Sequence, residues 1–343
     1  MHPSTPAIGI VTNPNARKNR AGRRLETLRA LVGDLGVVYE TRTVAELPAV
    51  ATELWRSGVR TWVSDGGDGT FHALLNAAAS TAPDGLSERG PAFLPTTGGT
   101  VDFVAKKAGL RGSADGTVRA LVALVRGGRE PTRVRLDTLE LVGWRNAQPE
   151  VPWRRFGFAA ALGGVGQRFF AKYYEDPRQG VAGALRVILK GMVGIGHRAP
   201  LLGRLIPPHL GAHAEHLIRP TPAQVTIDER VVPTTALHGL HVGSIDVDVG
   251  VARLFPYARE PGHMHVAVGS MTPAEIAVKW MVLAMGRPAS GPNWHEQAAR
   301  SLLVEGRGES LDPVVDGELY FGFDRLEVRL GPAVSVVQLH GAA

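Results

Sequence analysis

Short apolar runs alternate with segments of helical spacing up to about residue 132. The apolar runs predict β-strands over residues 7–12, 37–43, 60–64 and 92–95. Apolar residues recurring every three or four positions predict helices over residues 25–32, 44–57 and 70–80. Strands that alternate with helices form βαβ units around a parallel sheet. We therefore expect an α/β, Rossmann-like domain over residues 1–132.

The period of the pattern changes to two in the second part of the chain. Strict alternation is typical of antiparallel strands with one buried face. It predicts strands over residues 134–141, 224–232, 237–249, 263–268, 302–305 and 326–337. Helices are predicted over residues 167–174, 182–193 and 273–284. We expect a β-rich antiparallel sandwich over residues 133–343, whose last strand could return to the first domain, and a ligand cleft between the two domains.

The composition excludes several kinds of protein. The chain has 343 residues, 44% of them hydrophobic, and no cysteine. It therefore has no disulfide, no thiolate metal site and no cysteine nucleophile. Its first residues, M-H-P-S-T-P, lack the pattern of a signal peptide, and no apolar run approaches the roughly 18 residues that cross a bilayer. We expect a cytoplasmic protein.

The net charge of +6 and the pI near 9.9 favour an anionic partner such as a nucleotide, a nucleic acid or an acidic lipid surface. Basic residues and histidines gather over residues 178–219, where Glu215 is the one acid. An ordinary basic surface explains the charge equally well. No basic stretch is interleaved with aromatic residues in the manner of a base-stacking surface, so no nucleic acid is expected.

The stretch S-D-G-G-D-G-T at residues 64–70 lies between a predicted strand and a predicted helix. Ligands bind at this carboxyl edge of a parallel sheet. Glycines let backbone N–H groups approach a phosphate, and the following helix N-terminus attracts negative charge. A carboxylate there would repel phosphate unless it acts through a divalent cation or a polarised hydroxyl. The alternative is a plain turn in which Asp68 or Thr70 caps the helix.

The segment G-G-D-G-T at residues 66–70 resembles the nucleotide-binding signature of the diacylglycerol kinase catalytic-domain family, which includes sphingosine and ceramide kinases. NAD kinases and phosphofructokinases share this short motif. Three further segments resemble the lipid kinase family in order and separation: V-T-N-P at 11–14, residues 95–103 ending in G-T-V-D-F, and V-D-G-E at 315–318. The resemblance covers about residues 7–338.

The resemblance implies an NAD kinase/diacylglycerol kinase-like fold and an enzyme that uses ATP and Mg²⁺. It implies nucleotide-binding roles for Asn13, Gly66, Gly67, Gly69, Thr70, Gly98, Gly99 and Thr100. Asp68 would organise Mg²⁺ or its water, Asp316 would be the general base on the acceptor hydroxyl, and Glu318 would steer Asp316 or the metal. Without the resemblance, Asp316-Gly317 between apolar runs predicts a hairpin turn.

The chain departs from the family pattern at supporting positions. Ala16 replaces a serine after the Asn-Pro turn, Ala73 replaces a glutamate that would complete a capping box, and Val101 replaces an asparagine. Tyr257 and Pro261 replace carboxylates of a structural cation site, so we predict no second metal there. The predicted catalytic carboxylates are kept, which favours an active but divergent kinase.

We therefore hypothesise an ATP-dependent lipid kinase, peripheral to the inner face of the membrane, whose acceptor is a diacylglycerol or sphingoid-like lipid. An NAD kinase-like enzyme and a non-catalytic nucleotide or lipid sensor are the alternatives. The C-terminal sheet could pair across a homodimer or stay in a monomer. The histidines at 213, 216, 263 and 265 could bind a metal, but we expect surface or core histidines. The apolar and basic segment 201–210 could touch a membrane or pack on the β-rich domain.

Overall fold

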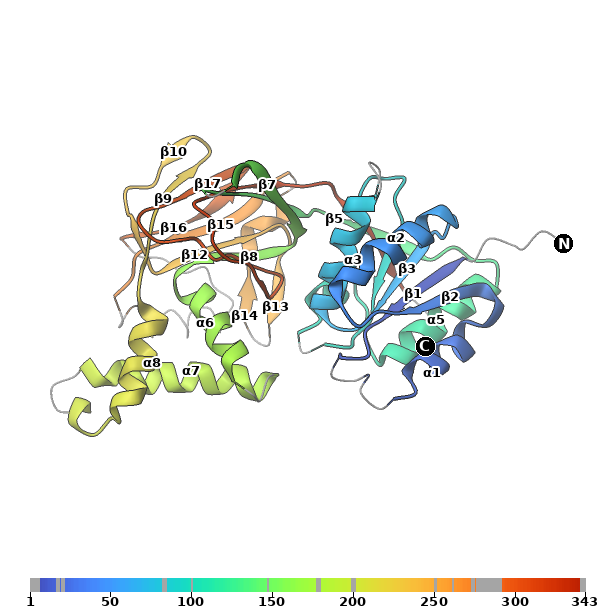
Figure 1. Ribbon diagram of the computed structural model, residues 1–343, viewed down its shortest axis with the longest axis horizontal. Helices are drawn as coiled ribbons and strands as arrows, with labels where there is room; N and C mark the ends of the chain where they lie inside the picture. The colour runs from blue at the N-terminus through green and yellow to red at the C-terminus, as the bar shows by residue number, and fades with distance from the viewer. Residues whose placement is uncertain are drawn as a thin grey trace. The chain divides into compact units, whose positions relative to one another are not determined.

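The computed structural model describes residues 7–16, 19, 22–81, 85–99, 101–146, 148–176, 180–198, 202–249, 252–260, 262–272, 275 and 292–339. The chain divides into two compact units, Met1–Thr138 with Gly331–Ala343, and Leu139–Leu330 (Figure 1). The chain therefore leaves the first unit after Thr138 and returns to it at Gly331.

The first unit is an α/β fold around a six-stranded sheet of order β2-β1-β3-β4-β21-β5. Its strands are β1 (Ile8–Thr12), β2 (Gly36–Glu40), β3 (Thr61–Asp65), β4 (Ala92–Pro95), β5 (Thr132–Leu136) and β21 (Val334–Gln338). Its helices are α1 (Arg24–Val32), α2 (Leu47–Arg56), α3 (Asp68–Thr81), α4 (Phe103–Lys107) and α5 (Ala114–Arg126), with 3₁₀ turns η1 (Gly33–Leu35) and η2 (Val44–Glu46). Strands β1 to β4 are parallel, and β21 pairs parallel with β4 and antiparallel with β5.

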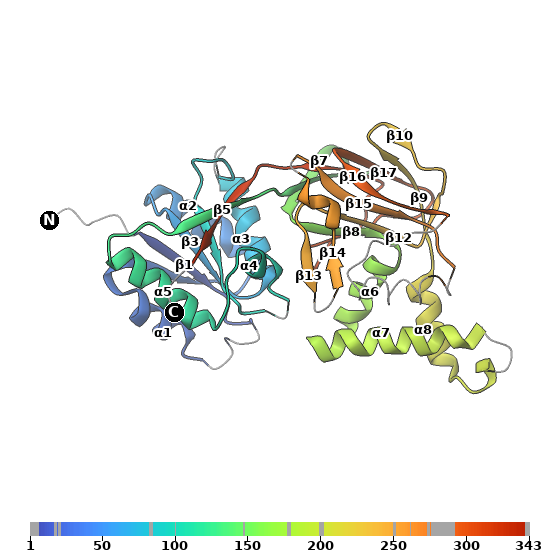
Figure 2. The ribbon, with the colours of Figure 1, turned by 180° about the vertical axis from the view of Figure 1, so that it is seen from behind.

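The helices of this unit pack in pairs, α1 with α5 and α2 with α3 (Figure 2). The crossover through α1 leads from β1 to β2, and the crossovers through α2 and α3 lead along the sheet in the other direction, so right-handed connections place α1 and the α2–α3 pair on opposite faces. Strands β1 and β3 are buried along their whole length, as a sheet covered on both faces requires. The ring of Phe93 meets Trp62 and Phe71 edge-on in the core, at centroid distances of 6.1 and 5.8 Å.

The second unit packs two antiparallel sheets on each other. One has the order β10-β9-β17-β20-β6-β7, with β11 paired to β9, and the other has the order β16-β15-β12-β8-β18-β19. The first sheet contains β6 (Leu139–Arg145), β7 (Gln148–Gly157), β9 (Thr221–Ile227), β10 (Arg230–Val231), β11 (Ala236–Leu237), β17 (Ser301–Gly306) and β20 (Arg325–Leu330). The second contains β8 (Ala159–Gly163), β12 (Gly239–Gly243), β15 (Met264–Gly269), β16 (Trp294–Ala299), β18 (Val314–Val315) and β19 (Glu318–Leu319).

The core of the second unit lies between these sheets and is aliphatic. Leu141, Val225 and Val304 from the first sheet belong to the same buried cluster as Leu162 and Val266 from the second. A two-stranded ribbon, β13 (Val247–Val249) with β14 (Ala252–Leu254), and the turn η5 (Pro256–Arg259) complete the β part. The helices α6 (Gly164–Glu175), α7 (Val181–Ile195) and α8 (Pro208–Ile218), with turns η3 (Gly196–Arg198) and η4 (Leu202–Arg204), form a separate helical layer (Figure 1).

The predicted fold class is confirmed: the first unit is a parallel-rich α/β sheet and the second consists of antiparallel sheets. Several predicted elements differ in detail. The segment 134–141 is not one strand, because β5 ends at Leu136 in the first unit and β6 starts at Leu139 in the second. The segment 201–210 includes the start of α8, at Pro208. Apart from Glu275, the predicted helix over 273–284 lies outside the described residues.

Candidate active site

The glycine-rich turn joins β3 to α3 at the carboxyl edge of the first sheet. In the parallel register Asp65, the last residue of β3, pairs with Thr12, the last residue of β1. Helix α3 begins at Asp68, and the carbonyl oxygen of Gly67 accepts from the backbone N–H groups of Thr70 (3.0 Å) and Phe71 (3.1 Å). The predicted strand–turn–helix context of the motif is therefore present.

A second glycine turn, after β4, lies directly against the first. The N–H of Gly98 donates to the carbonyl oxygen of Gly66 at 3.1 Å. A Cβ on Gly98 would lie 2.4 Å from that same oxygen, and a Cβ on Gly67 would lie 2.8 Å from the Cα of Gly99. Any side chain at these positions would separate the turns, so glycine is needed for the backbones to touch. Thr100, in the same segment, lies outside the described residues.

Asp68 links the two turns through hydrogen bonds. Its carboxylate accepts the backbone N–H of Asp102 at 2.8 Å and that of Phe103 at 3.0 Å, at the start of α4. Asp102 has a left-handed backbone (φ 52°), and its own carboxylate accepts the N–H of Gly99 at 2.7 Å. The predicted metal residue thus has a positioning role that the sequence did not reveal.

Asp65 has a different environment, because its side chain is 1% exposed. Its Oδ2 accepts from Thr12 Oγ1 at 2.7 Å, Asn19 Nδ2 at 3.1 Å and Arg24 Nε at 2.8 Å, and its Oδ1 accepts a second bond from the Arg24 guanidinium. Arg24 also pairs with the half-exposed Asp115 of α5. The hydrogen bond to Asp65 raises the pKa of Arg24, so the guanidinium stays charged.

The motif therefore contains two carboxylates with different structural roles. Asp65 anchors the end of β3 to α1 through Arg24, while Asp68 orders the second turn. Sequence reasoning assigned no role to Asp65 or Arg24. Their link joins positions 41 residues apart, which a local pattern does not show.

Asn13 lies beside these turns. Its N–H donates to the carbonyl oxygen of Asp65 (3.3 Å), and its Nδ2 lies 3.5 Å from the Thr70 Oγ1. The first unit thus brings together all the described residues predicted to bind the nucleotide. These are Asn13, Gly66, Gly67, Gly69, Thr70, Gly98 and Gly99.

In the second unit, Asp316 and Gly317 form the two-residue turn between β18 and β19. Both have positive φ, 50° and 94°, as a type I′ hairpin requires. Asp316 is 9% exposed, and its Oδ1 accepts the backbone N–H groups of Phe158 (2.8 Å) and Ala159 (2.9 Å). The residue is therefore both a hairpin residue and an oriented, nearly buried carboxylate.

Aromatic side chains surround this turn. The Tyr174 hydroxyl of α6 donates to the carbonyl oxygen of Gly317 at 2.8 Å. Burial, with the negative charge of Glu318, raises the pKa of Tyr174 to about 12, so the phenol keeps its proton at neutral pH. Glu318 is exposed on the same hairpin. Phe170 precedes Tyr174 by one helical turn and flanks Gly317.

Three of the four histidines considered above are at least partly buried. His265 is 2% exposed, and burial lowers its pKa to about 3. His213 and His216 of α8 are partly buried, and burial lowers the pKa of both. No group of three or more histidine or acidic side chains that could hold a metal ion occurs among the described residues.

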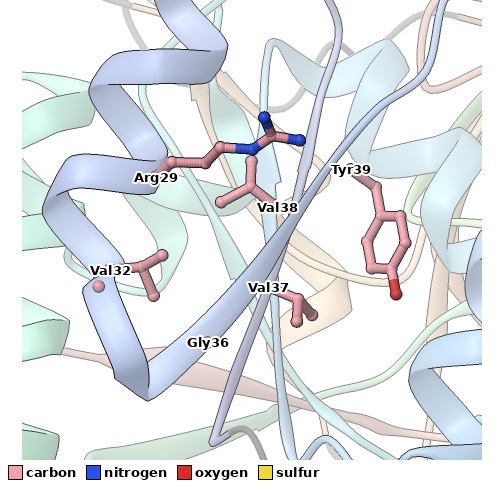
Figure 3. A pocket seen from close by; sticks show the side chains of 7 residues that line it. Arg29, Val32, Gly36, Val37, Val38 and Tyr39 are labelled. Atoms are coloured by element: carbon pink, nitrogen blue, oxygen red, sulfur yellow. The ribbon is translucent and has the colours of Figure 1, made fainter.

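A pocket elsewhere on the first unit carries no predicted site residue. It lies between α1 and the edge strand β2 and is lined by Arg29, Val32, Gly33, Gly36, Val37, Val38 and Tyr39 (Figure 3). Its titratable side chains are Arg29 and Tyr39, and burial raises the pKa of Tyr39. The pocket offers no carboxylate for the chemistry considered above.

Within the part of the chain that the structure describes, we find no helix of the length and apolarity needed to cross a membrane.

Comparison with known proteins identifies a related family and related folds. Residues 7–134 match the family model of the diacylglycerol kinase catalytic domain. None of the curated proteins compared with the chain matches it.

Solved structures are similar over nearly the whole chain. A diacylglycerol kinase from Bacillus anthracis str. Sterne is 14% identical, with 98% of each chain covered and a TM-score of 0.59. A second structure described as a diacylglycerol kinase from the same strain is 13% identical, with 98% of each chain covered and a TM-score of 0.64. Yeast NADH kinase in complex with NADH is 11% identical, with 96% of this chain and 82% of that chain covered and a TM-score of 0.51. The sequence-based resemblance is thus confirmed: residues 7–134 match the diacylglycerol kinase catalytic domain model, and the chain has the fold of bacterial diacylglycerol kinase-like proteins.

Proposed function

We propose that this protein transfers the γ-phosphoryl group of ATP to the hydroxyl group of a lipid. The observation that carries this proposal is the pair of glycine turns after β3 and β4, which touch through Gly66 and Gly98 and are fastened by Asp68. Two turns of this kind at one sheet edge expose backbone where phosphate groups bind. The kinase family match over residues 7–134 supports the same activity.

The nucleotide phosphates would lie at the N-terminus of α3, a helix of 14 residues. The partial positive charge of the helix dipole at this end favours negative charge there. Asn13 and Thr70, whose side-chain atoms lie 3.5 Å apart, would contact the same phosphates. This arrangement holds and orients the nucleotide, which is the main requirement of phosphoryl transfer.

The described residues fit Mg²⁺ only as a single-carboxylate site. Asp68 would hold the ion together with nucleotide phosphates and water, which is how Mg²⁺ is bound in many kinases. Two backbone N–H groups already orient this carboxylate. Bound Mg²⁺ would neutralise charge on the phosphate oxygens.

Asp316 is the proposed general base. The acceptor oxygen would form a bond to the γ-phosphorus as the bond to the bridging oxygen of ADP breaks, and Asp316 would take the hydroxyl proton. The N–H groups of Phe158 and Ala159 fix its orientation. Tyr174, which stays protonated, holds the turn from the other side through Gly317. Glu318 would adjust the charge around Asp316.

A lipid acceptor is supported by the aromatic residues of α6, two of which, Phe170 and Tyr174, lie against Gly317 next to Asp316. Phe169, Phe170, Tyr173 and Tyr174 form successive ring contacts along α6, with centroid distances of 5.3 to 6.5 Å. Aromatic side chains offer large apolar area with few polar groups, which suits an acyl or sphingoid chain more than a dinucleotide.

Phosphorylation of a nicotinamide dinucleotide is the second candidate, because the yeast NADH kinase has a related fold. The turn Asp316-Gly317-Glu318 and the opening Asn13-Pro14, which resemble lipid kinases, favour the lipid. A non-catalytic sensor is the third candidate, supported by the replaced residues Ala16, Ala73 and Val101.

The test is transfer of radiolabel from [γ-³²P]ATP by the purified protein with Mg²⁺. A total lipid extract and NAD⁺ are supplied in separate reactions. Label in an organic-extractable product supports the proposal. Label on NAD⁺ contradicts it in favour of the dinucleotide kinase, and ATP binding without transfer to either acceptor contradicts it in favour of the sensor.

A further inference from the structure

Helix α7 is apolar on two opposite faces, and one of these faces is packed. Val187 is 2% exposed and belongs to a small cluster with Leu217 and Ile218 of α8. Gly191 and Gly194 bring the helix close to α8, since a Cβ on Gly194 would lie 2.0 Å from a backbone oxygen of α8. This face is therefore fully used in holding α7 to its neighbour.

The other face of α7 is apolar and exposed. Leu185, Leu189, Met192 and Val193 are each between 46% and 53% exposed. Their spacing of four, three and one residues puts them on one side of the helix. Leu205, in the turn after η4, is 81% exposed. In both ribbon views α7 lies on the side of α6 and α8 that is remote from the sheets (Figures 1 and 2).

An apolar face of this kind on a soluble unit marks an interaction surface. A helix that is apolar on both sides is otherwise found buried or in contact with lipid. The charged residues around the exposed face indicate which kind of partner it binds.

The charged residues closest to this face along the chain are mostly basic. Lys190 on α7, Arg198 in η3 and Arg204 in η4 are exposed, and Glu215 is the one acid between residues 180 and 219. Arg186 is neutralised by Asp176 at 2.9 Å. Burial lowers the pKa of His213 and His216, so these side chains add no charge at neutral pH.

We propose that the exposed face of α7, with Leu205, docks on the surface of a bilayer that contains anionic phospholipid. The apolar side chains would enter the interface, and Lys190, Arg198 and Arg204 would contact the head groups. A second copy of the chain fits less well, because it would bring the same positive charges face to face. This inference rests on the proposed lipid kinase for its purpose, but docking is measurable without ATP or turnover.

The chain has no cysteine, so a single label can report on one position. Leu189→Cys carries an environment-sensitive NBD fluorophore, and Val231→Cys is the matched control. Val231 is also exposed, at 62%, and lies in the same unit on β10. Phosphatidylcholine vesicles with and without about one-third phosphatidylglycerol are the probe.

We expect a blue shift and an intensity increase for the label at 189 on anionic vesicles, a much weaker change on neutral vesicles, and none for the label at 231. The change should weaken with added salt, since exposed charges are screened. An unchanged label at 189 would overturn the proposal. An equal response on neutral vesicles would overturn the role of charge. If the fluorescence changes with protein concentration in the absence of vesicles, and sedimentation shows dimers, the face binds a second copy and the proposal is wrong.

Unlabelled variants give an independent check. Leu185→Gln with Leu189→Gln should lower the vesicle partition coefficient at least about tenfold, because two partly buried leucines are lost from the interface. Val231→Gln should leave it within about twofold of the wild-type value. Wild-type partitioning of the double variant would refute the proposal. Because partitioning is measured without nucleotide, loss of docking and absence of kinase activity are distinguishable results.

Discussion

Replacing Arg24 with methionine should destabilise the first unit strongly, because Asp65 would remain buried without its counter-charge. Asp65 is 1% exposed, and Arg24 supplies the one cation among the donors observed on it. Thr12 and Asn19 would still donate to the carboxylate, but neither carries a charge. Breaking a buried ion pair by removing one partner costs about 3–5 kcal/mol. We expect Arg24→Met to lower the free energy of unfolding by about that amount.

Two further variants separate the pair from its surroundings. Asp115, the second partner of Arg24, is 38% exposed. Asp115→Asn should therefore lower the free energy of unfolding by less than about 1 kcal/mol. Arg24→Met combined with Asp65→Asn removes both charges and should be more stable than Arg24→Met alone. Urea unfolding followed by circular dichroism measures all of these values. A cost for Arg24→Met below about 1 kcal/mol would refute the assignment of Asp65 as a buried anchor of β3.

Three other perturbations test separate parts of the structure. Gly98→Ala places a methyl group 2.4 Å from the Gly66 oxygen, so it should separate the turns. ATP binding should weaken at least about tenfold, and an unchanged affinity in calorimetry would contradict this. Gly157→Ala places its methyl group 2.4 Å from Val315 Cγ1 and 2.8 Å from Asp316 Oδ2, so it should displace the Asp316 turn and slow transfer with little effect on ATP affinity. Unchanged kinetics would contradict this. In the folded protein His265 stays neutral down to about pH 3. An unfolded histidine binds a proton below about pH 6.5. The free energy of unfolding should therefore fall by roughly 2–3 kcal/mol as the pH is lowered from about 7.5 to about 4.5. His265→Gln should flatten this fall in urea titrations at several pH values, and an equally steep fall would exclude the histidine as its source.

Much of the fold follows from local pattern. Residues 92–95 form β4 with the bounds that the apolar run predicts, because a proline ends the run and a glycine precedes it closely. The single strand predicted over 134–141 overlooked a break in the pattern, because the apolar positions shift from Val134 and Leu136 to Leu139 and Leu141 across the polar pair at 137–138. Strands β5 and β6 on the two sides of this break belong to different sheets. The break is made by a tertiary contact: Thr138 bonds to Pro332 and Gly331 where the two connecting segments meet. No period in the sequence encodes that contact.

The motifs of the candidate site could be predicted from the sequence, but the contacts between them could not. The glycine turn and the hairpin at Asp316 were located from residue types alone. What the sequence did not show is that the glycines of two turns permit backbone contact, or that Asp68 accepts N–H groups 34 and 35 residues away. The role of Asp65 depends on Arg24, and the orientation of Asp316 depends on Phe158 and Ala159 of another strand. These are long-range bonds that only folding brings about.

The most direct test of the central claim, that the protein is a working kinase with Asp316 as its base, is the transfer rate of Asp316→Asn. Asparagine tolerates the left-handed backbone at φ 50°, and its side-chain oxygen can still accept the N–H groups of Phe158 and Ala159. The substitution therefore keeps the hairpin and removes the base. With the acceptor that the wild type phosphorylates, we predict a rate at least about a hundredfold lower, with ATP affinity within about twofold of the wild type and an unchanged unfolding midpoint. A variant that transfers phosphate at nearly the wild-type rate would contradict the account and leave Asp316 as a hairpin residue alone.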